Sequence, residues 1–288
     1  TPRSSSAASD VYKRQDYADG FRKNIFLNQS DTSKKDELTI RYKLNWDISE
    51  TTDVNFLLSK VDMDDPADIW TIDGSLNTLS DRPGMDSQET DSVGIKLLKN
   101  FNHFDLQSFT SFTKTDVVFS YDADWGNPDS HFPYIYDYFS ETFRKRDTFS
   151  QEIRFLSNNI NFSEENPFEW IFGFHLSELE ETNLTRDDGA YGDPSDPFGP
   201  YVSESIILRN YEAENFSLFG NIDYFISDNL KLALGLRWEN WNSKYNDSNN
   251  LHLNLTGDNE TILLVDYLML RNYMNLDKYS KSIKVAKR

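Results

Sequence analysis

Carboxylates gather in three stretches of the chain, and these residues are the most suggestive of chemistry. The stretches hold Asp62, Asp64, Asp65 and Asp68; then Asp122, Asp124 and Asp129; then Asp187, Asp188, Asp193 and Asp196. Closely spaced carboxylate oxygens suit Ca²⁺. The spacing of an EF-hand loop is absent, because counting from Asp122 places Asn127 at the sixth position and Pro133 at the twelfth. We therefore predict solvated acidic loops, with no metal, no cofactor and no catalytic residue.

Aromatic side chains crowd the region between residues 120 and 146. The group comprises Trp125, Tyr134, Tyr136, Tyr138 and Phe139. Such rings can stack on a sugar or on another flat ligand. They can equally pack within a loop or form part of an aromatic girdle at a membrane surface. The second interpretation is the one we favour from sequence.

Composition excludes several classes of protein. The chain has no cysteine, and its formal net charge is −19. No His-Glu-x-x-His, Gly-x-Ser-x-Gly or phosphate-binding glycine loop occurs, so we expect no enzymatic activity. The acidic balance argues against nucleic acid, because a phosphate-binding face needs clustered Lys and Arg. No run of 18 apolar residues exists that could form a transmembrane helix.

Residues 38 to 48 alternate between apolar and polar side chains. Leu38, Ile40, Tyr42, Leu44, Trp46 and Ile48 share one side of the predicted strand, and Thr39, Arg41, Lys43, Asn45 and Asp47 share the other. Successive side chains of a strand point to opposite faces, so this strand has one apolar face and one charged face.

Eight such strands are predicted, in four hairpins. Their approximate bounds are Glu37–Ile48, Asp53–Val61, Thr90–Lys99, Phe104–Phe119, Asp147–Ser157, Phe168–Glu178, Glu212–Ile226 and Leu230–Trp241. Short turns alternate with long connectors over 62–88, 120–146 and 179–210. Strands of about ten residues, tilted, can cross a bilayer. The pattern predicts an all-β, antiparallel, up-and-down transmembrane β-barrel segment with short periplasmic turns and long extracellular loops.

In this arrangement the apolar side chains meet lipid and the polar ones face a lumen. Arg41, Lys43, Lys96, Arg154 and Arg237 then lie on the lumen side, where they can guide an anion or pair with Glu152, Glu169 or Glu239 across neighbouring strands. His175 is expected as a hydrogen-bonded wall residue. Lys60 near a strand end can extend to the lipid headgroups.

Both ends of the chain differ in character from the middle. Residues 1–15 are small, polar and unpatterned, and we interpret them as a non-native leader outside the fold. Residues 16–260 form the expected barrel region. Residues 261–288 lack a period of two and carry six Lys or Arg against two Asp, which suggests a tail produced by a frame slip.

Three stretches resemble the barrel region of TonB-dependent receptors. They are DGFRKN with DELTIRYKLNWDISE, TFSQEIRFLSN with FEWIFGFHLSELEE, and NFSLFGNIDYFISDNLKLALGLRWEN. The last stretch matches an aromatic-Phe-Gly strand, a short polar turn and an Ala-Gly-Leu-Arg-Tyr-like strand. Leu234-Gly235-Leu236-Arg237-Trp238 stands at that final element, and the resemblance spans about residues 16 to 260.

The resemblance implies part of a 22-stranded outer-membrane barrel from a Gram-negative bacterium. It implies energised uptake of a ferric siderophore, cobalamin or a glycan, with outer-membrane lipid around the barrel. The inner-membrane TonB complex is the implied partner, acting through a plug region that this chain does not show. Neither a TonB box nor the family's C-terminal aromatic strand is evident, so a barrel fragment is expected. No substrate-binding residue of the family can be placed here.

Two other interpretations remain open at this level. One is a different outer-membrane barrel, either a porin or a self-contained eight-stranded barrel, in which the strand near 37–48 pairs with that near 230–241. The other is a secreted β-sandwich that binds carbohydrate, in which Leu38, Tyr42, Leu44 and Leu234 pack beneath a second sheet.

Overall fold

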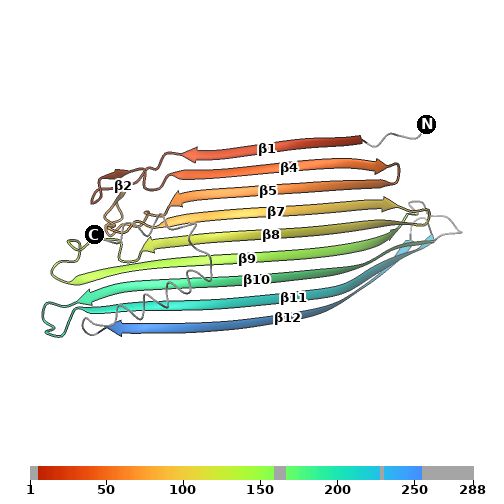
Figure 1. Ribbon diagram of the computed structural model, residues 1–288. Coiled ribbons are helices and arrows are strands. Elements are labelled where there is room, and N and C mark those ends of the chain that lie inside the picture. Colours follow the sequence, from red (N-terminus) through yellow and green to blue (C-terminus); the bar gives the residue numbers. More distant parts are fainter. Residues whose placement is uncertain (1–5, 159–166, 228–229, 255–288) are drawn as a thin grey trace.

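The computed structural model describes residues 6–158, 167–227 and 230–254, and the statements below concern these residues. Nine strands form one antiparallel sheet in the order β1-β4-β5-β7-β8-β9-β10-β11-β12. Their bounds are β1 Ser6–Ala18, β4 Lys35–Ser49, β5 Thr52–Pro66, β7 Met85–Asn100, β8 Phe104–Asp122, β9 Ile135–Ser157, β10 Phe168–Gly192, β11 Tyr201–Ser227 and β12 Leu230–Asn254. Figure 1 shows the strands side by side in one layer, with β1 and β12 at its edges. The predicted all-β, up-and-down architecture is confirmed.

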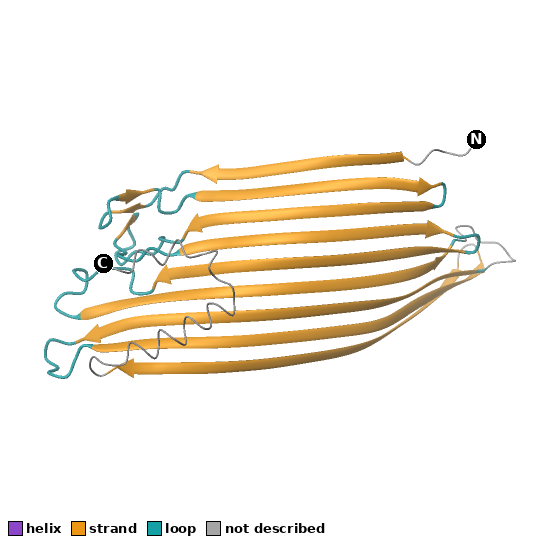
Figure 2. Ribbon diagram, viewed as in Figure 1, coloured by secondary structure: helices purple, strands orange, loops and turns teal. Residues whose placement is uncertain are grey.

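A small second sheet joins two of the long loops. It consists of β2 (Lys23–Asn24), β3 (Gln29–Ser30) and β6 (Asn77–Thr78). The long loops lie together at one end of the large sheet, where they are teal in Figure 2, and short turns lie at the other end. The described residues contain no helix of the length and hydropathy needed to cross a membrane.

The strands are longer than the alternation predicts. In the large sheet the strands from β4 to β12 have 15–27 residues, against the ten or so expected. Asp187, Asp188 and Gly189 were interpreted as turn residues, yet all three lie within β10. Each pairs with β9 on one side and with β11 on the other. Beyond the apolar belt the strands lack the apolar–polar alternation by which a strand is recognised in the sequence. They stay extended because they form hydrogen bonds with a neighbouring strand on each side.

Residues 6–18 correct a second expectation. We excluded the first fifteen residues from the fold, but β1 pairs with β4 from Ser6 opposite Asp47 to Ala18 opposite Lys35. Backbone pairing with the patterned β4 places this unpatterned segment in the sheet. That residues 1–15 are a non-native leader remains a prediction. The prediction of a frame-slipped tail over 261–288 concerns residues that lie outside those described.

The pairing register gathers apolar side chains on one face. Leu44 lies opposite Phe56, and Phe56 lies opposite Ile95. At the far edge Ile222 lies opposite Leu234, and Leu234 is 64% exposed. No second layer of described residues covers this apolar belt, so the packing that a β-sandwich requires is not observed.

The position of the belt indicates how the strands tilt. Following directly opposed residues from Leu44 through seven strand pairs leads to Asn240. The centre of the belt on β12 is instead Leu234, six residues away. At ~3.3 Å per residue and ~4.8 Å between strands, a level belt requires a tilt of roughly 30°. Membrane barrels have strand tilts of about 35–45°.

A row of charged residues borders the belt on the side of the long loops. One directly opposed series runs through Lys60, Asp91, Lys114, Asp147, Glu180, Glu212 and Lys244. Lys60 Nζ lies 3.5 Å from Asp91 and 2.6 Å from Glu89, so this lysine is ion-paired within the protein. Apolar side chains thus give way to charged ones on the side of the long loops, as expected at the edge of a lipid-facing band.

Two further features complete the fold. Beyond the charged row, on the same face, Val118, Phe143, Leu184 and Ile206 form a buried apolar cluster. Three of them lie in regions that the sequence assigned to connectors. Among the described strands β12 pairs with β11 and β4 pairs with β1 and β5, so β4 and β12 do not meet and the sheet is open.

Candidate functional site

The first acidic stretch does not form a single site. Asp62, Asp64 and Asp65 lie on β5, whereas Asp68 is buried in the loop that follows. Asp68 Oδ2 accepts hydrogen bonds from the Asn24 amide at 2.9 Å and from the Thr78 hydroxyl at 2.8 Å. Asp68 therefore anchors the small sheet.

Asp122 and Asp124 of the second acidic stretch are buried, which corrects the expectation of a solvated loop for these two, whereas Asp129 is exposed. Asp122 Oδ1 accepts hydrogen bonds from the backbone N–H groups of Asp124 and Trp125, each at 3.2 Å. Asp124 accepts from Gly126 N at 2.9 Å and from Tyr138 N at 2.7 Å. These carboxylates hold the turn after β8, because they satisfy backbone donors that the turn leaves free.

Asp122 and Asp124 lie near a third carboxylate, that of Asp81 in the neighbouring loop. Burial raises the pKa of Asp122 to about 7, with Asp124 and Asp81 adding to the effect. Burial also raises the pKa of Asp81, which lies near Asp137 and Asp124. Asp81 N donates to Gly126 O at 2.9 Å, so backbone hydrogen bonds hold the two loops together despite the like charges.

The third acidic stretch is divided among separate contacts. Asp187 accepts from Ser140 at 2.6 Å, and Asp188 pairs with Arg82 at 2.5 Å. Asp193 and Asp196 accept hydrogen bonds within the turn after β10. In the part of the chain that the structure describes, no group of three or more His, Asp or Glu residues is placed to hold a metal ion.

Tyrosines form a platform on the polar face near the long loops. Tyr136 lies opposite Tyr191, which lies opposite Tyr201, so three rings follow one row across β9, β10 and β11. The rings of Tyr136 and Tyr138 lie 4.9 Å apart, and Tyr138 covers Gly189. Sequence analysis identified Tyr136 and Tyr138 but missed Tyr191 and Tyr201, whose segment it interpreted as a connector.

The other aromatic candidates lie apart from this tyrosine platform. Phe139 points to the opposite face, where the Arg82 guanidinium lies 4.9 Å from its ring. Trp125 and Tyr134 lie in the loop before β9, each with more than two-fifths of its surface exposed. Phe139 is therefore packed, as expected, while the remaining rings are open to a ligand.

An arginine group lies on the same face, farther from the long loops than the platform, and was not predicted. Arg146 Nε donates to Glu181 at 2.7 Å, and Arg144 Nε lies 3.6 Å from the same carboxylate. Arg209 of β11 donates to Thr185 at 2.9 Å. The alternation of charges that would have revealed this group lies in segments interpreted as connectors.

The five predicted lumen cations all lie on the polar face. Arg154 pairs with Glu152, and Arg237 lies 3.3 Å from Glu239. Both partners stand two residues along the same strand, which corrects the expected pairing across strands. Glu169 makes no ion pair among the described residues.

The remaining polar-face candidates lack charged partners. Lys43 and Lys96 form no ion pair with any residue that the structure describes. His175 lies on the polar face, but its Nδ1 atom has no hydrogen-bond partner there, so the expected hydrogen bond is not observed at that atom.

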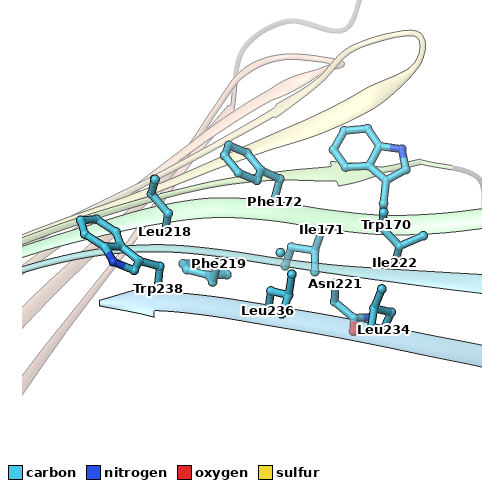
Figure 3. A pocket seen from close by; sticks show the side chains of 11 residues that line it. Trp170, Ile171, Phe172, Leu218, Phe219, Asn221, Ile222, Leu234, Leu236 and Trp238 are labelled. Carbon is cyan, nitrogen blue, oxygen red and sulfur yellow. The ribbon is translucent and has the colours of Figure 1, made fainter. Parts of the chain in front are cut away.

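A groove lies on the apolar face, near the short turns. Figure 3 shows Phe172, Leu218, Ile222, Leu236 and Trp238 standing around it. Its volume is about 450 Å³, and Gly220 forms part of its lining. The lining is almost wholly apolar, so acyl chains are a suitable filling and a polar substrate is not.

Comparison with known proteins identifies the family. A family model described as "TonB dependent receptor-like, beta-barrel" matches residues 16–262. No curated protein matches. The ferric yersiniabactin uptake receptor FyuA from Yersinia pestis is similar in fold, with a TM-score of 0.58 and 13% identity, over 86% of this chain and 38% of that one. The ferric citrate transporter FecA aligns with a TM-score of 0.43 and 12% identity, over 87% of this chain and 37% of that one.

These alignments set the scope of the assignment. The chain spans well under half the length of the two receptors. The likeness to FyuA shows the fold of the matched strands alone. The family model, by contrast, covers most of the chain and includes every strand from β4 to β12. The chain belongs to the TonB-dependent receptor β-barrel family.

Proposed function

We propose that this chain forms part of the wall of an outer-membrane receptor that takes up a scarce nutrient using energy passed on by TonB. The observation that carries the proposal is the open single-layer sheet, with an exposed apolar belt on one face and charged and polar side chains on the other. An apolar band of this kind is stable where lipid covers it. The family match supports the same interpretation.

The long-loop end of the polar face is where we expect the nutrient to bind first. The tyrosine platform offers adjacent rings for stacking, and the arginine group below it offers charge-assisted hydrogen bonds. A ferric siderophore with aromatic groups suits both features, and cobalamin or a glycan suits the rings alone. The partners would be outer-membrane lipid, the small ligand and the inner-membrane TonB complex.

The membrane topology can be tested with single cysteines, since the natural chain has none. Leu234 and Ala233 are sequence neighbours on opposite faces of β12. In outer membranes, Leu234→Cys should resist a water-soluble maleimide, and a fluorophore on it should be quenched by brominated lipid. Ala233→Cys should react with the maleimide and escape quenching.

Equal reactivity of the two cysteines in folded, membrane-inserted protein would overturn the proposal.

Uptake itself can be followed as growth of a transport-deficient Gram-negative host on a single iron chelate. Tyr191→Ala should reduce that growth, whereas Tyr245→Ala, also on the polar face but nearer the free edge, should not.

The rival interpretations have less support. A self-contained eight-stranded barrel requires β4 to pair with β12, and these strands lie at separate places in the described sheet. A secreted β-sandwich requires a second layer over Leu44 and Leu234, which the described residues do not provide.

A further inference from the structure

A hollow on the polar face carries positive charge in an otherwise acidic chain. Its volume is about 500 Å³, and its floor is formed by Gly94 of β7 and Leu57 of β5, which lie directly opposite each other. Lys43 and Lys96 line it, and no Asp or Glu does. The chain has 48 acidic and 29 basic residues, so a lining with two cations and no carboxylate stands out from the composition.

Both lysines are unpaired within the part of the chain that the structure describes, although Asp10 of β1 lies directly opposite Lys43 across the strand pair. Neither makes an ion pair or a hydrogen bond among the described residues, whereas Lys60 pairs with Glu89 and Lys231 with Asp223. Lys96 Nζ instead lies 5.4 Å from the centre of the Phe109 ring, and the Arg154 guanidinium lies 5.3 Å from the same ring. The ring steadies Lys96 beside the hollow without neutralising its charge.

Gly94 leaves the hollow open, although the surrounding atoms would allow a larger residue at this position. A β-carbon at this position would have Leu57 Cβ as its nearest neighbour, at 3.6 Å, which is ordinary contact. The missing side chain therefore leaves open space next to Lys96 on β7, and Leu57 of β5 separates this space from Lys43. Polar groups face that space from Asn45, Asn55 and Ser111.

We propose that this hollow is a binding site for a compact multivalent anion, one that carries carboxylate or phosphate groups. Lys43 and Lys96 would supply the charge, and the amide and hydroxyl groups would donate further hydrogen bonds. The volume is within the range of roughly 300–1,000 Å³ that small-molecule sites occupy. The site is separate from the tyrosine platform and lies toward the short turns.

Citrate is a suitable probe, titrated by calorimetry into the folded 288-residue chain in lipid vesicles at low ionic strength. Lys43→Gln and Lys96→Gln should each weaken citrate binding roughly tenfold, since a hydrogen bond to a charged group contributes about 1.5 kcal/mol or more. Lys114→Gln is the matched control, because it removes the same charge from the opposite face and should change the affinity less than about twofold.

Gly94→Leu provides a variant that keeps every charge. It should abolish citrate binding by filling the hollow, while Gly94→Ala should retain most of it. The circular dichroism of each variant confirms that the sheet has formed.

Three results would overturn the proposal: no citrate binding at millimolar concentration, equal losses in Lys96→Gln and Lys114→Gln, or binding of poly-glutamate in place of citrate. None of these depends on the cysteine labelling, so this site and the proposed membrane topology can fail separately.

Discussion

The ring of Phe219 lies over Gly173, directly opposite it on the paired strands β11 and β10. A β-carbon at residue 173 would be 2.5 Å from the ring Cζ atom and 2.7 Å from the backbone oxygen of Ile153. Tyr138 covers Gly189 in the same way on β9 and β10. In each pair the aromatic ring fills the space above a glycine, which protects the strand from the weakness that glycine introduces.

Gly173→Ala should therefore destabilise the sheet by about 1–3 kcal/mol, because the new methyl group has no room beside the ring. Gly220→Ala is the matched control on β11, where the nearest atom to a β-carbon is 3.4 Å away and the cost should be smaller. Urea unfolding in lipid vesicles measures both. The penalty at residue 173 should shrink in a Phe219→Ala background; an unchanged penalty there would show that the ring is not its cause.

The apolar belt gives a second prediction. Leu44→Arg and Leu234→Arg should each cost about 2–4 kcal/mol if these positions lie near the middle of the membrane. Asn45→Arg and Ala233→Arg should cost much less, because these neighbours point to the polar face. The free energy of unfolding in vesicles is again the measurement, and similar costs on both faces would contradict the register.

Alternation identifies the strands only where one face is apolar. Leu230 to Trp238 alternate throughout, so the face of each residue on β12 was predicted from sequence. Tyr191 and Arg144 lie beyond the belt, where polar side chains occur on both faces and the few apolar ones do not produce a clear period of two. Their strands stay extended because a paired strand lies on each side, and that is a property of the sheet.

Predicting a site also requires the register between strands. The sequence placed Lys43 and Lys96 on one face, as the structure does. It could not show that Gly94 lies in one row with Leu57 and Lys43, because β5 and β7 are brought together across a long loop. Asp122 was expected in solvent for a similar reason: the loop that buries it comes from residues 67–84.

Arg82 links that loop to the sheet and gives a third prediction. Its guanidinium pairs with Asp137 at 2.8 Å and with Asp188 at 2.5 Å. Arg82→Gln should leave both carboxylates without a cation and loosen the loop, at a cost of roughly 1–3 kcal/mol given its partial exposure. Hydrogen exchange of the loop amides should accelerate.

Lys35→Gln is the control for this experiment, since Lys35 pairs with Glu37 at an exposed site. Equal exchange rates in the two variants would mean that the Arg82 bridge does not hold the loop.

Asp122 gives the last prediction, which concerns pH. Burial, with Asp124 and Asp81 nearby, raises the pKa of Asp122 to about 7 from an ordinary value of about 3.9. Between those values the folded state binds more protons than the unfolded state, so stability falls as the pH rises from about 4 to 7 and then levels off. The loop clamp should therefore be most stable in mild acid.

Asp122→Asn tests this directly, because the asparagine oxygen can still accept from the N–H groups of Asp124 and Trp125. The variant should match the natural protein at pH 4 and be more stable at pH 8, so its profile of unfolding free energy against pH should be flatter. Asp129→Asn removes an exposed carboxylate from the same loop and should leave the profile unchanged. Parallel profiles for the natural protein and Asp122→Asn would show that the pH dependence arises at another group, such as Asp81, whose pKa burial also raises.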